Sequence, residues 1–160
     1  MSQVALKERT NIDLHNDLIK KAEDLIPVLQ QRSNEANLDR RVPKETIQEM
    51  KDAGFFKILQ PKQYGGFELD PHTFSEVQLR IAQGCMSTAW VLGVVGIHPF
   101  RLALYDDKAQ QEVWGENDNT LVSSSYAPMG QVTPVDGGFK VSGHWQWSSG
   151  SDHCERTRAR

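Results

Sequence analysis

Cysteine is scarce in this sequence, with only Cys85 and Cys154 among 160 residues. The two lie far apart and form no Cys-x-x-Cys pair, which excludes a disulfide framework and a cysteine-based zinc site. The five histidines also lack the spacing of metal ligands relative to acids or cysteines, so we expect no bound metal. Both cysteines are predicted to be reduced thiols of a cytoplasmic protein.

The chain also lacks an excess of basic residues and any long apolar run. Its formal net charge is -3, which argues against nucleic acid as the main partner. The most apolar segment, residues 89–100, is too short to span a bilayer, and the first ten residues contain no secretory signal. We therefore expect a cytoplasmic protein that binds neither membrane nor nucleic acid.

The common nucleotide-binding and hydrolase motifs are absent as well. There is no Gly-x-Gly-x-x-Gly, no phosphate-binding loop ending in Gly-Lys-Ser/Thr, no His-Glu-x-x-His and no Gly-x-Ser-x-Gly. A cofactor, if one binds, must therefore be held by strand edges, hydroxyl groups and aromatic faces.

The first two thirds of the chain show the 3- and 4-residue apolar spacing of helices. Caps and helix breakers predict helices over residues 13–38, 43–53, 71–84, 87–98 and 106–114. Pro27 should kink the first helix or end it early, and Pro99 should break the fourth just after His98. Because residues 87–98 are apolar nearly all round, we expect that helix to be buried in the middle of a domain.

After residue 119 the apolar pattern changes to alternation. Residues 121–126 and 131–135 are predicted strands, and Asp136-Gly137-Gly138 is a strong hairpin signal. In the next strand one face is apolar and the other polar, so we predict a half-buried antiparallel strand. Its apolar face comprises Phe139, Val141, Trp145 and Trp147.

The order of these elements predicts an α+β fold. We expect a helical domain over residues 1–118, a partial antiparallel β-domain over 119–154, and a charged non-family tail over 155–160 in which no apolar strand continues. The tail suggests a frameshift, a premature stop or a truncated gene model, with a short natural variant as the alternative.

Two sets of motifs resemble a known family. Residues 40–70, with Pro-x-x-Tyr-Gly-Gly at Pro61 to Gly66, are similar to the N-terminal helical domain of the acyl-CoA dehydrogenase superfamily. The Trp90-(x)7-His98-Pro99 helix and Trp-x-Trp-Ser-Ser-Gly at residues 145–150 resemble one branch. That branch is the oxygenase component of two-component, reduced-flavin-dependent aromatic monooxygenases.

The resemblance implies an activity and its partners. Such an oxygenase hydroxylates a small phenolic substrate with O2 and reduced FMN or FAD, which a separate flavin reductase supplies. Family members are homotetramers and continue into a C-terminal helical bundle, which is missing here, so we expect a truncated form that is active only when it is completed. Enzymes of this branch exclude water from the active site with an apolar pocket that contains a few precisely positioned hydroxyl groups.

The resemblance also implies roles for single residues. Ser149 resembles the position whose hydroxyl meets the reactive flavin edge, Ser148 assists it, and Trp90 resembles a flavin-pocket position. His98 and Ser124 resemble residues that hold the phenol. The catalytic candidates are therefore His98, on the substrate side, and Ser149, on the flavin side. Without the resemblance, Trp90 would be core, His98 a satisfied buried histidine, and Ser149 a turn cap.

Two other functions remain open at this point. The chain is alternatively a fragment of a true acyl-CoA dehydrogenase, which oxidises a thioester with FAD, although the Trp-(x)7-His-Pro helix argues against it. The third hypothesis is a non-catalytic remnant that at most associates with a partner.

Overall fold

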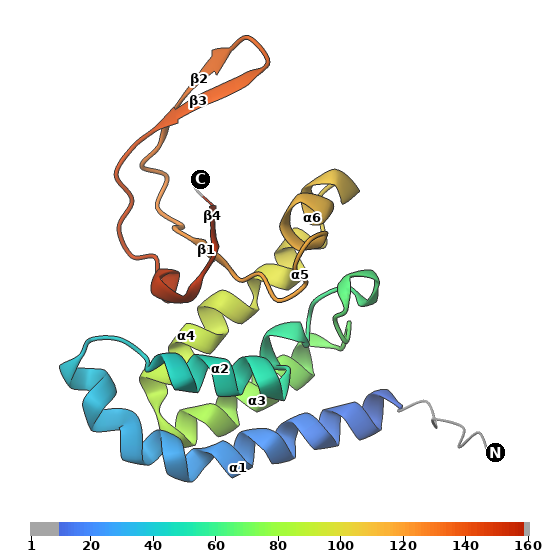
Figure 1. The fold of residues 1–160 in the computed structure, drawn as a ribbon, viewed down its shortest axis with the longest axis vertical. Helices are drawn as coiled ribbons and strands as arrows, with labels where there is room; N and C mark the ends of the chain where they lie inside the picture. The colour runs from blue at the N-terminus through green and yellow to red at the C-terminus, as the bar shows by residue number, and fades with distance from the viewer. Residues whose placement is uncertain (1–9, 159–160) are drawn as a thin grey trace.

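The computed structural model describes residues 10–158. Six α-helices precede the strands in this part of the chain, which confirms the α+β order (Figure 1). The helices are α1 (Asn11–Leu38), α2 (Lys44–Ala53), α3 (Pro71–Gly84), α4 (Met86–Gly96), α5 (His98–Leu102) and α6 (Asp107–Trp114). Short 3-10 turns cover Phe55–Lys57, Lys62–Tyr64 and Ser151–His153.

Side-chain and glycine caps define several helix ends, and those at Asp70 and Gly54 were predicted from the sequence. Thr10 and Asp13 form a capping box at the start of α1, and Asp70 accepts a hydrogen bond from the His72 amide in α3. Gly54 ends α2 with φ 87°, a left-handed conformation that glycine adopts without strain. These local signals therefore act as expected.

The two prolines predicted to end or break helices, Pro27 and Pro99, act differently from the prediction. Pro27 lies inside α1, which continues to Leu38, so the helix is not ended early, and Figure 1 shows its axis turning in the second half. Packing of Leu18, Ala22 and Leu29 in the core outweighs the hydrogen bond that Pro27 removes. The break near Pro99 precedes His98 rather than following it, because Pro99 occupies the first turn of α5.

The hydrophobic core lies between α1, α3 and α4, with α2 packed beside them. Its fully buried large side chains include Leu18, Met50, Phe55, Val77, Ile81 and Leu92. The prediction that α4 is buried all round is wrong, because Trp90 is 61% exposed and Met86 is also exposed. One face of α4 packs on α3, while Trp90, Val91 and Val95 of α4 border residues 149–150.

Within residues 10–158, four strands form two separate two-stranded sheets. β2 (Gln131–Val135) and β3 (Gly138–Ser142) make the predicted antiparallel hairpin, and β1 (Val122–Ser124) pairs in parallel with β4 (Arg156–Arg158). In the charged tail, where no apolar strand is predicted, residues 156–158 nevertheless form a short strand. A backbone ladder needs no apolar side chains, so a charged sequence can form it.

The predicted burial of the β2–β3 hairpin differs most from the structure. Every residue of β2 and β3 is exposed, so the predicted half-buried strand is wrong, and Figure 1 shows the hairpin projecting away from the helices. β3 ends at Ser142, so Trp145 and Trp147 lie outside it, and β1 is shorter than predicted. Trp147 has φ 61° and is 86% exposed, which contradicts its assignment to a β-core.

Candidate active site

A buried histidine and a buried serine meet between the helices and the first strand. His98 is the first residue of α5 and Ser124 the last of β1, and His98 Nε2 lies 3.2 Å from Ser124 Oγ. Both side chains are about 5% exposed, so the pair lies in a region of reduced dielectric. Either group can donate, depending on the imidazole tautomer. The two substrate-binding candidates are thus brought together.

Hydrogen bonds from Ser148 and Ser125 connect the end of β1 to the segment before the Ser151–His153 turn. Ser148 Oγ donates to the Ser124 carbonyl oxygen at 3.0 Å, and Ser125 Oγ donates to the Gln146 carbonyl oxygen at 2.8 Å. These bonds satisfy backbone acceptors across about 20 residues of sequence. Ser148, expected beside the cofactor, is therefore engaged with the backbone of Ser124 in this structure.

A second pair joins α4 to the same segment. The indole Nε1 of Trp90 donates to Ser149 Oγ at 3.1 Å. Since the hydroxyl accepts this bond, its own hydrogen remains able to donate to a ligand atom. Gly150, with φ 77°, permits the approach, because a Cβ there would lie 2.7 Å from Val95 Cγ2. The two cofactor candidates Trp90 and Ser149 are thus also in contact.

Sequence reasoning missed two residues beside His98. The Tyr126 ring lies 6.4 Å from the His98 ring between centroids, and the Arg101 guanidinium lies 5.1 Å from the Tyr126 centroid. The sequence did carry a signal, since Ser124 and Tyr126 are two residues apart and would share one face of the strand predicted over residues 121–126. Tyr126 therefore belongs to the wall of the candidate site, with Arg101 stacked on it.

A cavity of about 620 Å³ opens next to the Trp90–Ser149 pair. Such a volume suits a small-molecule ligand. Its lining comes from the end of α1, the loop before α2, the start of α4 and the Ser149–His153 turn, and it comprises Ala36, Asn37, Arg40, Arg41, Val42, Met86, Ser87, Trp90, Val91, Ser149, Gly150, Asp152 and His153. The cavity combines aromatic, aliphatic and cationic walls.

Burial and nearby charges shift the pKa of His153, which lines this cavity. Burial lowers the pKa of His153, and the cations Arg41, Lys44 and Lys51 lower it further, against an opposing effect of Asp152. The imidazole is therefore held in its neutral form near pH 7.

Burial also raises the pKa of the Cys154 thiol to about 12. Its Sγ donates to the Gly150 carbonyl oxygen at 3.3 Å, and both cysteines are free. Cys154 is therefore an unreactive packing residue beside the turn.

Metal ligation finds no support in the part of the chain that the structure describes, where no group of three or more His, Cys, Asp or Glu side chains could hold an ion. Within residues 10–158, none of the helices is both long enough and apolar enough to cross a membrane.

Comparison with known proteins identifies the family. The model of the acyl-CoA dehydrogenase N-terminal domain matches residues 15–116, more than half of the chain. The chain belongs to this acyl-CoA dehydrogenase N-terminal domain family. The match covers the helices that build the core and carry Trp90 and His98.

Relatives within this family are oxygenase components. The chain is 49% identical over 135 residues to the oxygenase subunit HsaA of a flavin-dependent monooxygenase from Mycobacterium tuberculosis, which covers 84% of this chain and 34% of the relative. It is 34% identical over 138 residues to the oxygenase component of p-hydroxyphenylacetate 3-hydroxylase from Acinetobacter baumannii, covering 86% and 33%. The chain therefore spans about a third of the length of these relatives.

A solved structure has the same fold. The crystal structure of the M. tuberculosis HsaA monooxygenase superposes with a TM-score of 0.88 at 46% identity, covering 91% of this chain and 40% of that one. The fold of this chain is thus similar to that of the corresponding part of the HsaA monooxygenase.

Proposed function

We propose that this chain provides substrate- and flavin-binding residues of the oxygenase component of a two-component, flavin-dependent aromatic monooxygenase. The observation that carries the proposal is the paired arrangement of the candidates, His98 with Ser124 and Trp90 with Ser149. The Ser148–Ser124 hydrogen bond links the segments that carry the two pairs. The relatives named above are oxygenase components, which supports the same activity here.

The residues present fit a flavin ring in three respects. Trp90 offers an exposed indole, the Ser149 hydroxyl retains a hydrogen that can be donated to a ring nitrogen, and a ligand-sized cavity lies beside them. Reduced FMN or FAD, when bound, supplies the activation of O2. We propose that Ser149 donates to the flavin edge and that Trp90 fixes the orientation of that hydroxyl.

The buried pair is suited to a phenol. A phenolic hydroxyl that enters between His98 and Ser124 can donate to the imidazole and accept from the serine hydroxyl. His98 then takes up the phenol proton as a general base and makes the ring more electron-rich, while burial excludes water. Ser124 orients the substrate oxygen, and the Tyr126 ring limits the movement of the imidazole.

The proposal extends to partners. The activity requires a flavin reductase that delivers reduced flavin, together with O2 and a small phenolic substrate. We propose a homotetramer for the assembled enzyme and a cytoplasmic location, in line with the family resemblance. A true acyl-CoA dehydrogenase is the alternative, and an acyl-CoA thioester is its diagnostic ligand.

Phenol binding to this chain tests the proposal. A phenol should perturb the nuclear magnetic resonance signals of the His98 ring, and its methyl ether, which cannot donate, should not. His98→Ala and Ser124→Ala should each weaken phenol binding about tenfold, because each removes a buried hydrogen bond. The exposed Thr133→Ala on β2 is the matched control and should bind normally.

Three results would argue against the proposal. They are equal affinity for the phenol and its methyl ether, unchanged affinity in both alanine variants, and preferential binding of an acyl-CoA thioester at the same residues.

A further inference from the structure

The cavity beside Trp90 has a cationic end that the proposed phenol and flavin contacts do not use. Arg40 and Arg41 lie on the loop between α1 and α2, and both line the cavity. Among the side chains that the structure describes, neither guanidinium takes part in an ion pair or a hydrogen bond. Two adjacent arginines thus line a ligand-sized space without forming an ion pair there.

The loop that presents these arginines is well defined. The Arg41 amide donates to the Ala36 carbonyl oxygen at 3.1 Å, and Arg40 has φ 51°. The left-handed region is sterically unfavourable for a residue other than glycine. The turn nevertheless carries arginine there, and the α1 hydrogen bonds fix its direction.

The start of α4 adds positive potential on the opposite wall. Met86 and Ser87 in its first turn line the cavity, no side chain caps this terminus, and no acidic residue lies in the first turn. The unpaired amide groups of a helix N-terminus favour an anion. This wall therefore reinforces the preference of the two guanidinium groups.

The other charged groups around the cavity do not remove its preference for an anion. Asp152 is the one carboxylate in the lining, and it opposes two guanidinium groups. The neighbouring His153 is held neutral near pH 7, while Lys44 and Lys51 lie close enough to lower its pKa. The cavity therefore has a positive end and, at Trp90 and Val91, an aromatic and aliphatic end.

We propose that this cavity binds the oxyanion of an aromatic ligand, with Arg40 and Arg41 on the carboxylate or phosphate and Trp90 beside the ring. The ring assignment rests on the proposed function, whereas the anion assignment rests on the arginines and the α4 terminus. Two sources share this chemistry, namely an acidic arm on the phenolic substrate and the phosphate of the flavin. Arginine suits both because its fork of donors matches two oxygens at once.

Matched ligand pairs separate the two sources. The affinity of the chain is measured for 4-hydroxyphenylacetate against its neutral amide, and for FMN against riboflavin, which lacks the phosphate. We expect one acidic member to bind about tenfold more tightly than its neutral partner, with the advantage shrinking as salt is added. Inorganic phosphate should compete with the acidic member of the preferred pair and leave the neutral one unaffected.

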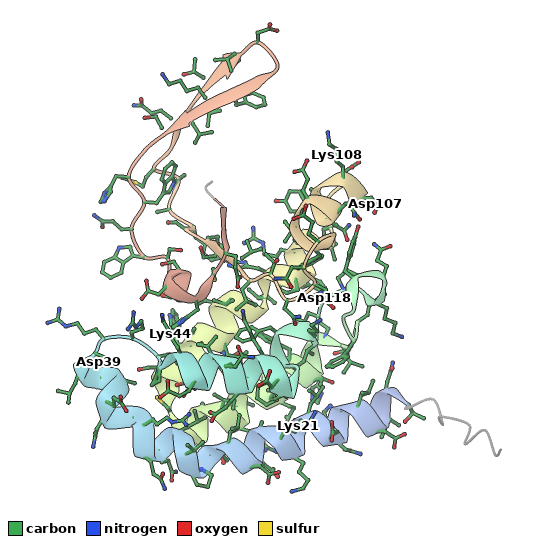
Figure 2. All side chains as sticks on the ribbon, in the orientation of Figure 1. Lys21, Asp39, Lys44, Asp107, Lys108 and Asp118 are labelled. Carbon is green, nitrogen blue, oxygen red and sulfur yellow. The ribbon has the colours of Figure 1, made fainter. Side chains whose placement is uncertain are left out.

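Charge-removing variants locate the site. Arg40→Ala and Arg41→Ala should each reduce the advantage of the acidic ligand several-fold without changing the affinity for the neutral one. Lys108→Ala is the control, because Figure 2 places Lys108 on α6, far from Lys44 and Asp39, which flank the arginine loop. Both arginines are exposed, so their replacement should leave the fold intact, which circular dichroism checks.

The outcomes distinguish this site from the proposed function. Equal binding of acidic and neutral ligands, or an acidic advantage that survives both arginine variants, overturns the anion site while phenol binding at His98 stands. Arginine-dependent binding of phosphate without any phenol binding supports the anion site and contradicts the proposed function. Failure of every ligand and of phosphate to bind overturns both.

Discussion

The helical part of the chain and the β2–β3 hairpin have similarly regular sequence patterns but very different surroundings. In α3 and α4 the apolar positions Val77, Ile81 and Leu92 are fully buried. In the hairpin, Val132, Phe139 and Val141 are more than half exposed, although they alternate as regularly. A periodic pattern therefore predicts the type of element, while burial depends on what packs against it.

This difference should be largest in local stability. A two-stranded hairpin alone is marginal in water, so amides of residues 131–142 should open with a free energy near zero. Core amides of α3 and α4 should open only at the cost of global unfolding, which gives a difference of about 5 kcal/mol. Native-state hydrogen exchange measures both. Strong protection across residues 139–142 in a monodisperse monomer would remove the contrast.

Matched truncations should show the same contrast in the free energy of unfolding. Leu92→Ala leaves a cavity in the hydrophobic core and should destabilise the chain by about 3 kcal/mol. Val141→Ala on the exposed hairpin should change stability by less than about 0.5 kcal/mol. Urea unfolding of the two variants gives the comparison, and equal effects would mean that the hairpin has a partner in solution.

The turn at Gly150 should be sensitive because it brings the serine segment against α4. An alanine there would have an unfavourable φ of 77°, and its Cβ would collide with Val95. We expect a loss of about 2 kcal/mol together with disruption of the Trp90–Ser149 hydrogen bond. Thermal unfolding and the indole N–H signal of Trp90 measure the two effects. Gly137→Ala, also at positive φ but in open space, is the control.

Glu155 links the strand region to the helical part, and removing its charge should have a small effect. It accepts a hydrogen bond from the Leu121 amide at 2.8 Å and lies 3.2 Å from Lys51 Nζ. Burial alone would raise the pKa of Glu155, but these bonds and its own amide lower it overall. Because the side chain is half exposed, solvent screening limits its contribution to about 0.5–1 kcal/mol.

The pH dependence of this contribution follows from the lowered pKa. It is fully present above the ordinary pKa of 4.5, where the unfolded chain is also ionised, and is lost as pH falls through the lower folded value. Glu155→Gln should therefore be less stable than the parent chain at pH 7 and closer to it at pH 3. A stability difference independent of pH would show that the carboxylate charge is not involved.

Much of the fold was predictable because local chemistry determines it. Asp70, Gly54 and Asp106 mark helix ends through capping and left-handed geometry, which single residues encode. The exposure of Trp90 and the pairing of Arg156–Arg158 with β1 were not predictable, since both depend on neighbours distant in sequence.

The residues of the candidate site were likewise only partly predictable from the sequence. The resemblance suggested the five candidate residues, and the structure brings them into linked pairs whose roles stay proposals. Tyr126, Arg101 and the Arg40–Arg41 loop were missed because their significance comes from packing rather than from a motif.

The central claim is tested most directly by hydroxylation. The chain, extended by the C-terminal part of the HsaA relative that it does not span, is supplied with a flavin reductase, FMN or FAD, O2 and a phenol, and both the hydroxylated product and hydrogen peroxide are measured. The account predicts hydroxylated product that depends on this chain. His98→Ala should lose about a hundredfold in hydroxylation, and Ser149→Ala should release more peroxide per product, with Thr133→Ala unchanged. Absence of product above the reductase alone, or unchanged coupling and rate in both site variants, would contradict it.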